Sequence, residues 1–186
     1  MMLPVRHKRA TVGGQSVSPH GLLSSLFAEC TRMRRDQGRP PLTALIDVPV
    51  DQAIQADPVL IRRALEPLVR RAFESAAQPD PGREVPSLRE VVVTSVDLGD
   101  AIEIEVADSG AGLSDAVRRW LCDAGDRPQA DEFQAPSLPE GAGLTLAAVR
   151  AAVARLGGSL RAANCPEGGV AITLRLPSRQ SQRMAA

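Results

Sequence analysis

The sequence predicts an α+β fold, a two-layer α/β sandwich in which a mixed β-sheet carries helices on one face. Two observations support this prediction. Three segments place apolar residues at the three- and four-residue spacing of an amphipathic helix. Runs of β-forming residues, separated by Gly and Pro turns, lie between and after these segments. A helix with one apolar face must bury that face, and a sheet can bury several helices together.

The first elements follow a basic stretch at 1–17, which we expect to be a flexible arm. Ser18 and Pro19 are typical of a helix start, because Ser caps the first turn and Pro fits its first position. This helix is expected to end at the Gly and Pro residues of 38–41. Residues 42–48 predict a strand, and residues 52–55 predict a shorter second one.

A long second helix is predicted to run from its cap, Asp57, to about Ala77. Its apolar residues form one continuous stripe, made of Leu60, Ile61, Ala64, Leu65, Leu68, Val69, Ala72 and Phe73. Residues 89–97 and 101–107 are then rich in β-forming residues. The Leu-Gly-Asp turn at 98–100 joins them, which predicts a hairpin.

A long connection at 113–140 comes next, with one candidate short helix at 116–122. A connection of this length inside a compact domain is usually a functional lid or a mobile loop. An amphipathic helix at 144–156 follows, and two glycines stop it.

The chain closes with strands at 159–163 and 170–176, which a Pro- and Gly-containing turn joins into a second hairpin. We expect the last residues, 178–186, to be a disordered tail. The folded domain would then cover 18–177. At 186 residues the chain is long enough for one domain with one core.

The charge balance excludes some classes of partner. Lys plus Arg equals Asp plus Glu, at 22 each, which gives no reason to expect nucleic acid. No run approaches the roughly 18 apolar residues that a membrane span needs, so we expect no membrane insertion. Cys30, Cys122 and Cys165 are far apart and lack metal-ligand spacing. They predict reduced, mostly buried thiols in a cytoplasmic protein.

A first glycine cluster follows a predicted strand directly: Asp108, Ser109, Gly110, Ala111 and Gly112. A carboxylate at a strand end can accept a hydrogen bond from an exocyclic amine such as that of adenine. Glycines beside it allow the backbone to approach a flat ring closely. The alternative is a simple turn that ends the strand, since Gly and Asp are common turn residues.

A second glycine cluster, Gly141-Ala142-Gly143, opens the predicted helix at Leu144. Backbone N–H groups are exposed at a helix start, and the helix dipole adds partial positive charge, so phosphate is favoured there. The alternative is a flexible hinge that binds no ligand.

Together the two clusters resemble the gyrase and histidine-kinase ATPase superfamily. The run VADSGAGL at 106–113 is similar to the first glycine box of that superfamily. The run FQAPSLPEGAGLTLA at 133–147 resembles the phenylalanine box and second glycine box of sensor kinases. Residues 149–177 look like the closing helix and hairpin. The resemblance covers roughly 15–177, and the order and spacing of the motifs match.

The resemblance implies a Bergerat-type ATP-binding fold with ATP or ADP as ligand. Asp108 would bind the adenine amine, and 113–140 would form a lid over the nucleotide. Thr145 stands where the family usually has Gly, and its hydroxyl would face the nucleotide. The residues implied to line the site are Asp108, Gly110, Gly112, Gly141, Gly143, Leu144 and Thr145.

The long helix departs from the family pattern. Pro67 and Arg71 occupy positions where two asparagines are expected, and the second asparagine normally helps to hold Mg²⁺. Arg offers only donors and a fixed positive charge, whereas Mg²⁺ requires oxygen ligands. The sequence therefore argues against Mg²⁺ binding, and no metal ligand is assigned. Arg71 would either contact the phosphates directly or pair with Glu74.

Two further expectations concern the same helix. Pro67 lacks an N–H and removes one helical hydrogen bond, at about 3 kcal/mol, so we expect a kink. Some superfamily ATPases use a helix Glu as general base, but Glu66 is one residue out of register for that role. We expect its side chain to be exposed or salt-bridged.

The resemblance implies a catalytic-type, ATP-binding domain of a sensor histidine kinase in two-component signalling. Its partner would be a histidine-containing dimerisation domain or a response regulator, on another chain or a missing segment. His7 and His20 are not followed by the acid and Pro typical of a phosphoacceptor. Because of the departures on the helix, we expect impaired or absent kinase activity. The alternatives are a pseudokinase docking module and a serine kinase of the anti-sigma type.

Overall fold

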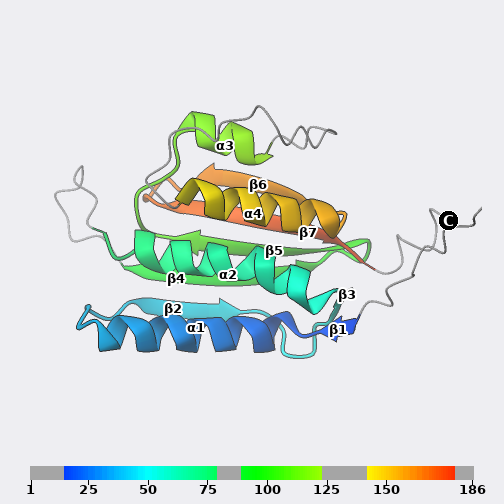
Figure 1. The fold of residues 1–186 in the computed structure, drawn as a ribbon, viewed down its shortest axis with the longest axis horizontal. Helices are drawn as coiled ribbons and strands as arrows, with labels where there is room; N and C mark the ends of the chain where they lie inside the picture. The colour runs from blue at the N-terminus through cyan, green and yellow to red at the C-terminus, as the bar shows by residue number, and fades with distance from the viewer. Residues whose placement is uncertain (1–14, 79–88, 123–141, 179–186) are drawn as a thin grey trace, which may run out of the picture.

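A mixed five-stranded sheet organises the molecule, whose computed structural model describes residues 15–78, 89–122 and 142–178. The strand order is β2-β4-β5-β7-β6, as Figure 1 shows. The strands are β2 (Thr43–Asp47), β4 (Glu90–Asp97), β5 (Ala101–Asp108), β6 (Ser159–Asn164) and β7 (Val170–Pro177). β2 runs parallel to β4, and every other pair in the sheet is antiparallel. Both predicted hairpins, β4-β5 and β6-β7, are confirmed.

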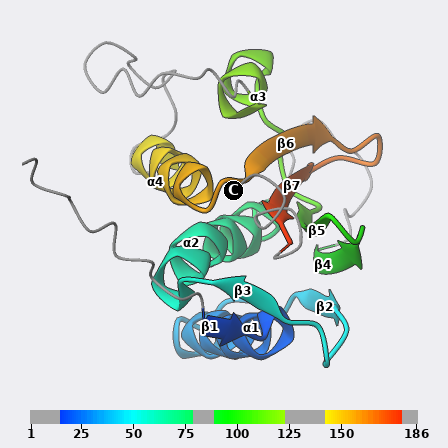
Figure 2. The same ribbon diagram turned by 90° about the vertical axis from the view of Figure 1, so that its right-hand side faces the viewer.

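Three helices cover one face of the sheet: α1 (Pro19–Asp36), α2 (Pro58–Ser75) and α4 (Ala142–Arg155). Seen from the end of the sheet, they form a second layer (Figure 2). The short helix α3 (Asp115–Cys122) packs instead against β6, at the edge of the sheet. The predicted fold class, a two-layer sandwich with a mixed sheet, is confirmed.

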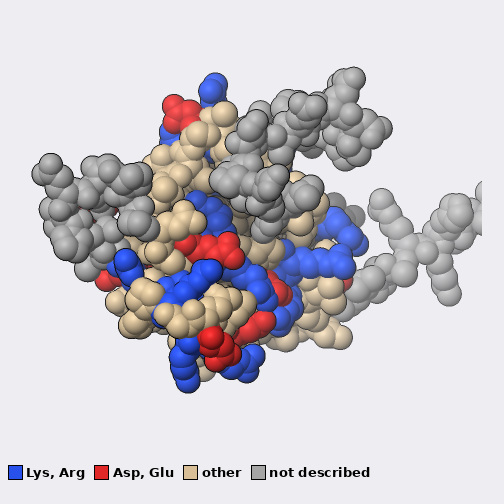
Figure 3. All heavy atoms as spheres, turned by 60° about the vertical axis from the view of Figure 1, so that its left-hand side comes forward, with Lys and Arg blue, Asp and Glu red and all other residues tan. Residues whose placement is uncertain are grey.

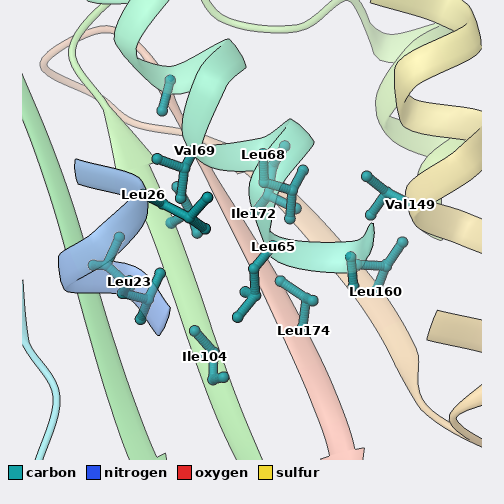
Figure 4. Packing of buried hydrophobic residues seen from close by; sticks show 14 of the residues in the cluster. Leu23, Leu26, Leu65, Leu68, Val69, Ile104, Val149, Leu160, Ile172 and Leu174 are labelled. Carbon is teal, nitrogen blue, oxygen red and sulfur yellow. The ribbon is translucent and has the colours of Figure 1, made fainter. Parts of the chain in front are cut away.

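The core lies between the sheet and α2, the central helix (Figure 4). Every residue of the predicted apolar stripe of α2 is buried. Leu65 and Leu68 lie close to Ile172 and Leu174 of β7. The core is mostly aliphatic, and burial of one such side chain contributes about 1.5–3 kcal/mol. One aromatic pair joins two helices, with the rings of Phe27 and Phe73 edge to face at 5.1 Å.

Both predicted helix caps are confirmed. The side chain of Ser18 accepts a hydrogen bond from Gly21 N at 3.1 Å, and that of Asp57 accepts one from Val59 N at 2.8 Å. Each cap satisfies an N–H that would otherwise lack a helical partner. α2 continues through Pro67, whose missing N–H leaves the carbonyl of Arg63 without its usual helical donor.

The arm assigned to 1–17 is three residues too long. Residues Gln15–Val17 form a short strand, β1, which pairs antiparallel with β3 (Ile54–Ala56), so that Val17 faces Ile54. A strand of three residues is too short for an alternating pattern to show in the sequence. The remainder of the arm, residues 1–14, lies outside the described residues.

Ser178, which was assigned to the tail at 178–186, is held by hydrogen bonds. Ser178 donates from its N to Asp100 O at 2.8 Å and from its Oγ to Gly99 O at 2.6 Å. These bonds fasten the end of β7 to the turn of the β4-β5 hairpin, where Gly99 has a φ of 82°. Residues 179–186 lie outside the described part of the chain.

The cysteines differ in exposure, and the prediction of mostly buried thiols is wrong. Cys30 is buried, Cys165 is half-buried and Cys122 is exposed, and all three are free. Burial, the largest influence, raises the pKa of the Cys30 thiol. Within the described residues, no helix combines the length and the apolar character required to cross a bilayer.

Candidate functional site

Asp108 lies at the end of β5, a central strand with neighbours on both sides. It faces Val91 of β4 and Val170 of β7 across the ladders. Its side chain is only 1% exposed. The carboxylate Oδ1 accepts a hydrogen bond from Gly110 N at 2.9 Å, which closes the turn that follows the strand. The predicted acid therefore lies at a strand end as expected, and it is buried.

Arg71 of α2 reaches this carboxylate from the helix layer. Its Nη1 lies 2.7 Å from Asp108 Oδ2, and its side chain is 16% exposed. Arg71 therefore pairs with Asp108 and not with Glu74, the acid on its own helix. When one member of a buried pair is removed, an uncompensated charge remains, which costs about 3–5 kcal/mol. The ion pair therefore stabilises the structure in which it is closed.

Sequence reasoning missed the Arg71–Asp108 pair, although the helical pattern carries a signal for it. Arg71 lies three residues after Leu68 and seven after Ala64, both of which are buried. This spacing places Arg71 at the border of the apolar face of α2, directed toward the sheet. What the pattern could not supply was the acid opposite Arg71.

The glycines of the first cluster lie where the chain passes close to other elements. A Cβ on Gly110 would lie 2.3 Å from the backbone oxygen of Ser75, at the end of α2. A Cβ on Gly112 would lie 2.8 Å from the side chain of Asn164. Close packing therefore accounts for both glycines. Their implied part in a base pocket stays a prediction.

Asn164, at the end of β6, is a second residue that sequence reasoning missed. Its Oδ1 accepts from Leu113 N at 2.9 Å, and its Nδ2 donates to Leu113 O at 2.9 Å. The two bonds copy a backbone ladder pair and fix the segment that leads from the glycine cluster into α3. Cys122, at the other end of α3, accepts from Ala162 N of β6 through its Sγ at 3.2 Å.

α3 also contacts the helix layer. The guanidinium carbon of Arg150 in α4 lies 5.2 Å from the ring centroid of Trp120, a cation–π distance. Val117 and Leu121 are buried. The candidate helix at 116–122 is confirmed, and it is packed on β6 and near α4.

The second glycine cluster is described only in part. Gly141 lies outside the described residues. α4 begins at Ala142, so the backbone of Gly143, Leu144 and Thr145 belongs to the first turns of the helix, two residues earlier than predicted. Of the expected lid, residues 123–140 also fall outside the described part of the chain. The assignment of Gly141, Gly143, Leu144 and Thr145 to a phosphate site stays a prediction.

A network of charges lies on the outer side of α1 and α2. Glu66 accepts from Arg62 Nε at 2.8 Å and from Arg70 Nε at 3.1 Å, so the prediction that it is salt-bridged is confirmed. Arg70 Nη2 also donates to Glu29 of α1 at 2.8 Å. On the face shown in Figure 3, basic and acidic side chains lie beside one another and form no large patch of one sign.

Comparison with known proteins defines the family. The family model described as "Histidine kinase-, DNA gyrase B-, and HSP90-like ATPase" matches residues 56–180, which is more than half of the chain. The chain belongs to this family. The match covers α2, the first glycine cluster, the second glycine cluster and the closing hairpin. It confirms the resemblance on which the sequence analysis relied.

One curated relative of this ATPase family is a sensor protein. The C4-dicarboxylate transport sensor protein DctS of Rhodobacter capsulatus is 32% identical over 162 residues, or 85% of this chain. The aligned part is 22% of that protein. The chain therefore spans about a fifth of the length of this relative.

Solved structures of the family share the fold. The mycobacterial sensor histidine kinase MprB has a TM-score of 0.64 at 22% identity, covering 89% of this chain and 98% of its own. The catalytic domain of histidine kinase ThkA, in a nucleotide-free form, has a TM-score of 0.67 at 18% identity and coverage of 88% and 97%. Full-length ShkA in complex with AMPPNP has a TM-score of 0.64 at 20% identity and coverage of 89% and 31%.

Proposed function

We propose that this chain is the ATP-binding, catalytic-type domain of a sensor histidine kinase, with phosphotransfer that is impaired or absent. Membership of the ATPase family and the likeness to a sensor protein support the first part. The second part depends on one observation: Arg71, in place of a metal-ligating asparagine, is paired with the acid proposed to bind adenine.

The residues of α2 do not fit Mg²⁺. Arg71 has only donor groups, and its charge repels a cation. At about 4 Å and an effective dielectric of about 20, each pair of unit charges is worth about 4 kcal/mol, and Mg²⁺ carries two charges. Pro67 supplies no side-chain oxygen at the other asparagine position.

The remaining assigned residues would bind a nucleotide without its metal. Asp108 would accept a hydrogen bond from the base, and the start of α4 would face the phosphates with its free N–H groups. The task of such a domain is to position the terminal phosphate for in-line attack by a histidine, mainly through orientation and electrostatics. A histidine-containing dimerisation domain, on another chain or a missing segment, would supply this acceptor, and a response regulator would be a further partner.

Titration with ATP and ADP tests this function. We expect binding whose affinity changes less than about threefold when EDTA replaces Mg²⁺, since the chain lacks the usual metal ligand. We also expect little phosphotransfer to a separately supplied histidine domain. Tight binding that requires Mg²⁺, together with rapid phosphotransfer, would contradict the proposal.

A second candidate function is a docking module that has lost nucleotide turnover. The Arg71–Asp108 pair favours it, because this contact satisfies the buried acid without any ligand. A thermal-shift assay with ATP and ADP separates a docking module with an empty site, which nucleotide does not stabilise, from a nucleotide-binding domain. Phosphotransfer to a supplied histidine domain then separates a domain that only binds nucleotide from a kinase.

A further inference from the structure

Each carboxylate oxygen of Asp108 already accepts one hydrogen bond. Oδ1 accepts a hydrogen bond from Gly110 N at 2.9 Å, and Oδ2 accepts one from Arg71 Nη1 at 2.7 Å. The side chain is 1% exposed, so water has almost no access to it. A carboxylate has about four acceptor positions, but this burial leaves the unused positions closed to another donor while both partners stay in place.

The two partners differ in how easily they move. The Gly110 bond belongs to the backbone turn, and that turn is pressed against Ser75, as shown by the 2.3 Å at which a Cβ on Gly110 would meet the Ser75 oxygen. The turn therefore packs closely against the end of α2. Arg71 is a long, partly exposed side chain that can rotate out. Its guanidinium is the displaceable partner.

A guanidinium N–H and an adenine amine N–H can occupy the same position on a carboxylate, because each donates one hydrogen bond to an oxygen. They differ in charge. A charge-assisted bond is about twice as strong as a bond to a neutral donor. An adenine amine therefore cannot displace Arg71 by this bond alone.

We infer that Arg71 lowers the affinity of this site for adenine by acting as an internal ligand of Asp108, in the place of the adenine amine. The inference rests on the proposed function, in which Asp108 recognises the base. In the structure described here the site is closed to adenine. An adenine nucleotide binds only when the ion pair opens. Its apparent affinity is therefore its affinity for the open state multiplied by the fraction of molecules in which the pair is open.

The packing of α2 limits the opening of the Arg71–Asp108 pair to a movement of the Arg71 side chain. Val69 before Arg71 and Ala72 and Phe73 after it are buried in the core, and Phe73 packs on Phe27 of α1. The backbone of α2 is therefore anchored on both sides of Arg71. The pair opens through rotation of the Arg71 side chain, without a shift of the helix.

Adenosine binding to the whole chain tests the inference directly. Adenosine has the base but no phosphate, so the loss of a positive charge at residue 71 does not disturb the comparison. We expect Arg71→Asn to bind adenosine at least tenfold more tightly than the wild type in isothermal titration. Arg63→Asn is the matched control, because Arg63 lies exposed on the same helix. This variant should bind adenosine with the affinity of the wild type.

A second variant covers the case in which Arg71→Asn unfolds because Asp108 loses its partner. Arg71→Gln keeps an N–H donor at similar length but without the charge. Its affinity for adenosine should lie between those of the wild type and Arg71→Asn. Circular dichroism establishes that each variant is folded before titration.

The outcomes separate the inference from the function on which it rests. If the wild type binds adenosine as tightly as the folded variants, or more tightly, Arg71 does not block the base and the inference is overturned, while the nucleotide site stands. If neither the wild type nor any folded variant binds adenosine, ATP or ADP, the proposed nucleotide site fails and the inference fails with it.

Discussion

Asn164 holds Leu113 through both atoms of its side-chain amide, at 2.9 Å each. The bond pair joins the end of β6 to the segment between the first glycine cluster and α3, across 51 residues of chain. These two bonds attach the candidate site to β6, at the far edge of the sheet.

Replacement of Asn164 should loosen α3. In Asn164→Ala, the N–H and the carbonyl of Leu113 both lose their partners, which should lower the free energy of unfolding by about 1–3 kcal/mol. Asn164→Asp retains the acceptor for Leu113 N and loses the donor, so it should be less destabilised. Urea denaturation measures both values. Equal stability of Asn164→Ala and the wild type would show that the two bonds contribute nothing.

Gly110→Ala should be strongly destabilising. The new Cβ would lie 2.2–2.4 Å from atoms of Ser75, including the backbone. Because the backbone must shift to relieve this overlap, we expect the free energy of unfolding to fall by about 1–3 kcal/mol or more.

Gly21→Ala is the matched control for this substitution. Gly21 lies in the first turn of α1, and its nearest neighbour would be Ser18 Oγ at 3.5 Å, an ordinary contact. Ala is the better helix former by about 0.8–1 kcal/mol, so this variant should be more stable than the wild type. Thermal unfolding of the two variants should therefore shift in opposite directions. Unchanged or raised stability of Gly110→Ala would show that the contact with Ser75 is unimportant.

Two carboxylates should respond very differently to loss of charge. Asp108→Asn leaves Arg71 largely buried without a counter-ion and should cost about 3 kcal/mol. Glu29→Gln breaks a partly exposed pair with Arg70 and should cost no more than about 1 kcal/mol. The effect of Glu29→Gln should also shrink in high salt, because salt screens exposed pairs more than buried ones. Guanidinium chloride, which is itself a salt, should be avoided in favour of urea.

The Cys30 thiol should make stability fall at high pH. Burial, the largest influence, raises its pKa above the ordinary value, and the charges of Glu29 and Glu66 act in the same direction while Arg70 opposes them. The folded state therefore keeps the proton when the unfolded state has lost it. Stability is fully present below the unfolded pKa of about 8.5 and declines as pH rises from there toward the folded pKa.

Comparison with Cys30→Ala isolates this effect. Between about pH 8 and 10 the free energy of unfolding of the wild type should fall more steeply than that of the variant. Native-state alkylation gives an independent reading, because exposed Cys122 should react well before buried Cys30. Parallel pH profiles of the two proteins would mean that Cys30 does not titrate with unfolding.

The elements that could be predicted from the sequence are those with a local cause. α2 was predictable because its stripe is continuous and Asp57 caps its start. The β4-β5 hairpin was predictable from two β-rich runs around Gly99. β1 was missed because three residues cannot show a period, and the start of α4 was misplaced by two residues because the glycines there suggested a loop.

The candidate site was predictable only on one side. Asp108 stands out by its place between a strand and two glycines. Its partner does not, because Arg71 is 37 residues away and only the packing of α2 on the sheet brings the two together. Asn164 was missed for the same reason. A contact between distant residues depends on the register of whole elements, which single-residue patterns do not contain.

The bond between Cys122 Sγ and Ala162 N has a bearing on self-association. β6 is an outer strand, and an outer strand with free backbone groups can recruit a strand from another molecule. α3 lies along β6, and the sulfur already occupies the outward-facing Ala162 amide. Among the described strands, β6 is thus an edge that α3 shields from pairing with a strand of another molecule. Asn164, which binds Leu113, helps to keep α3 in this place.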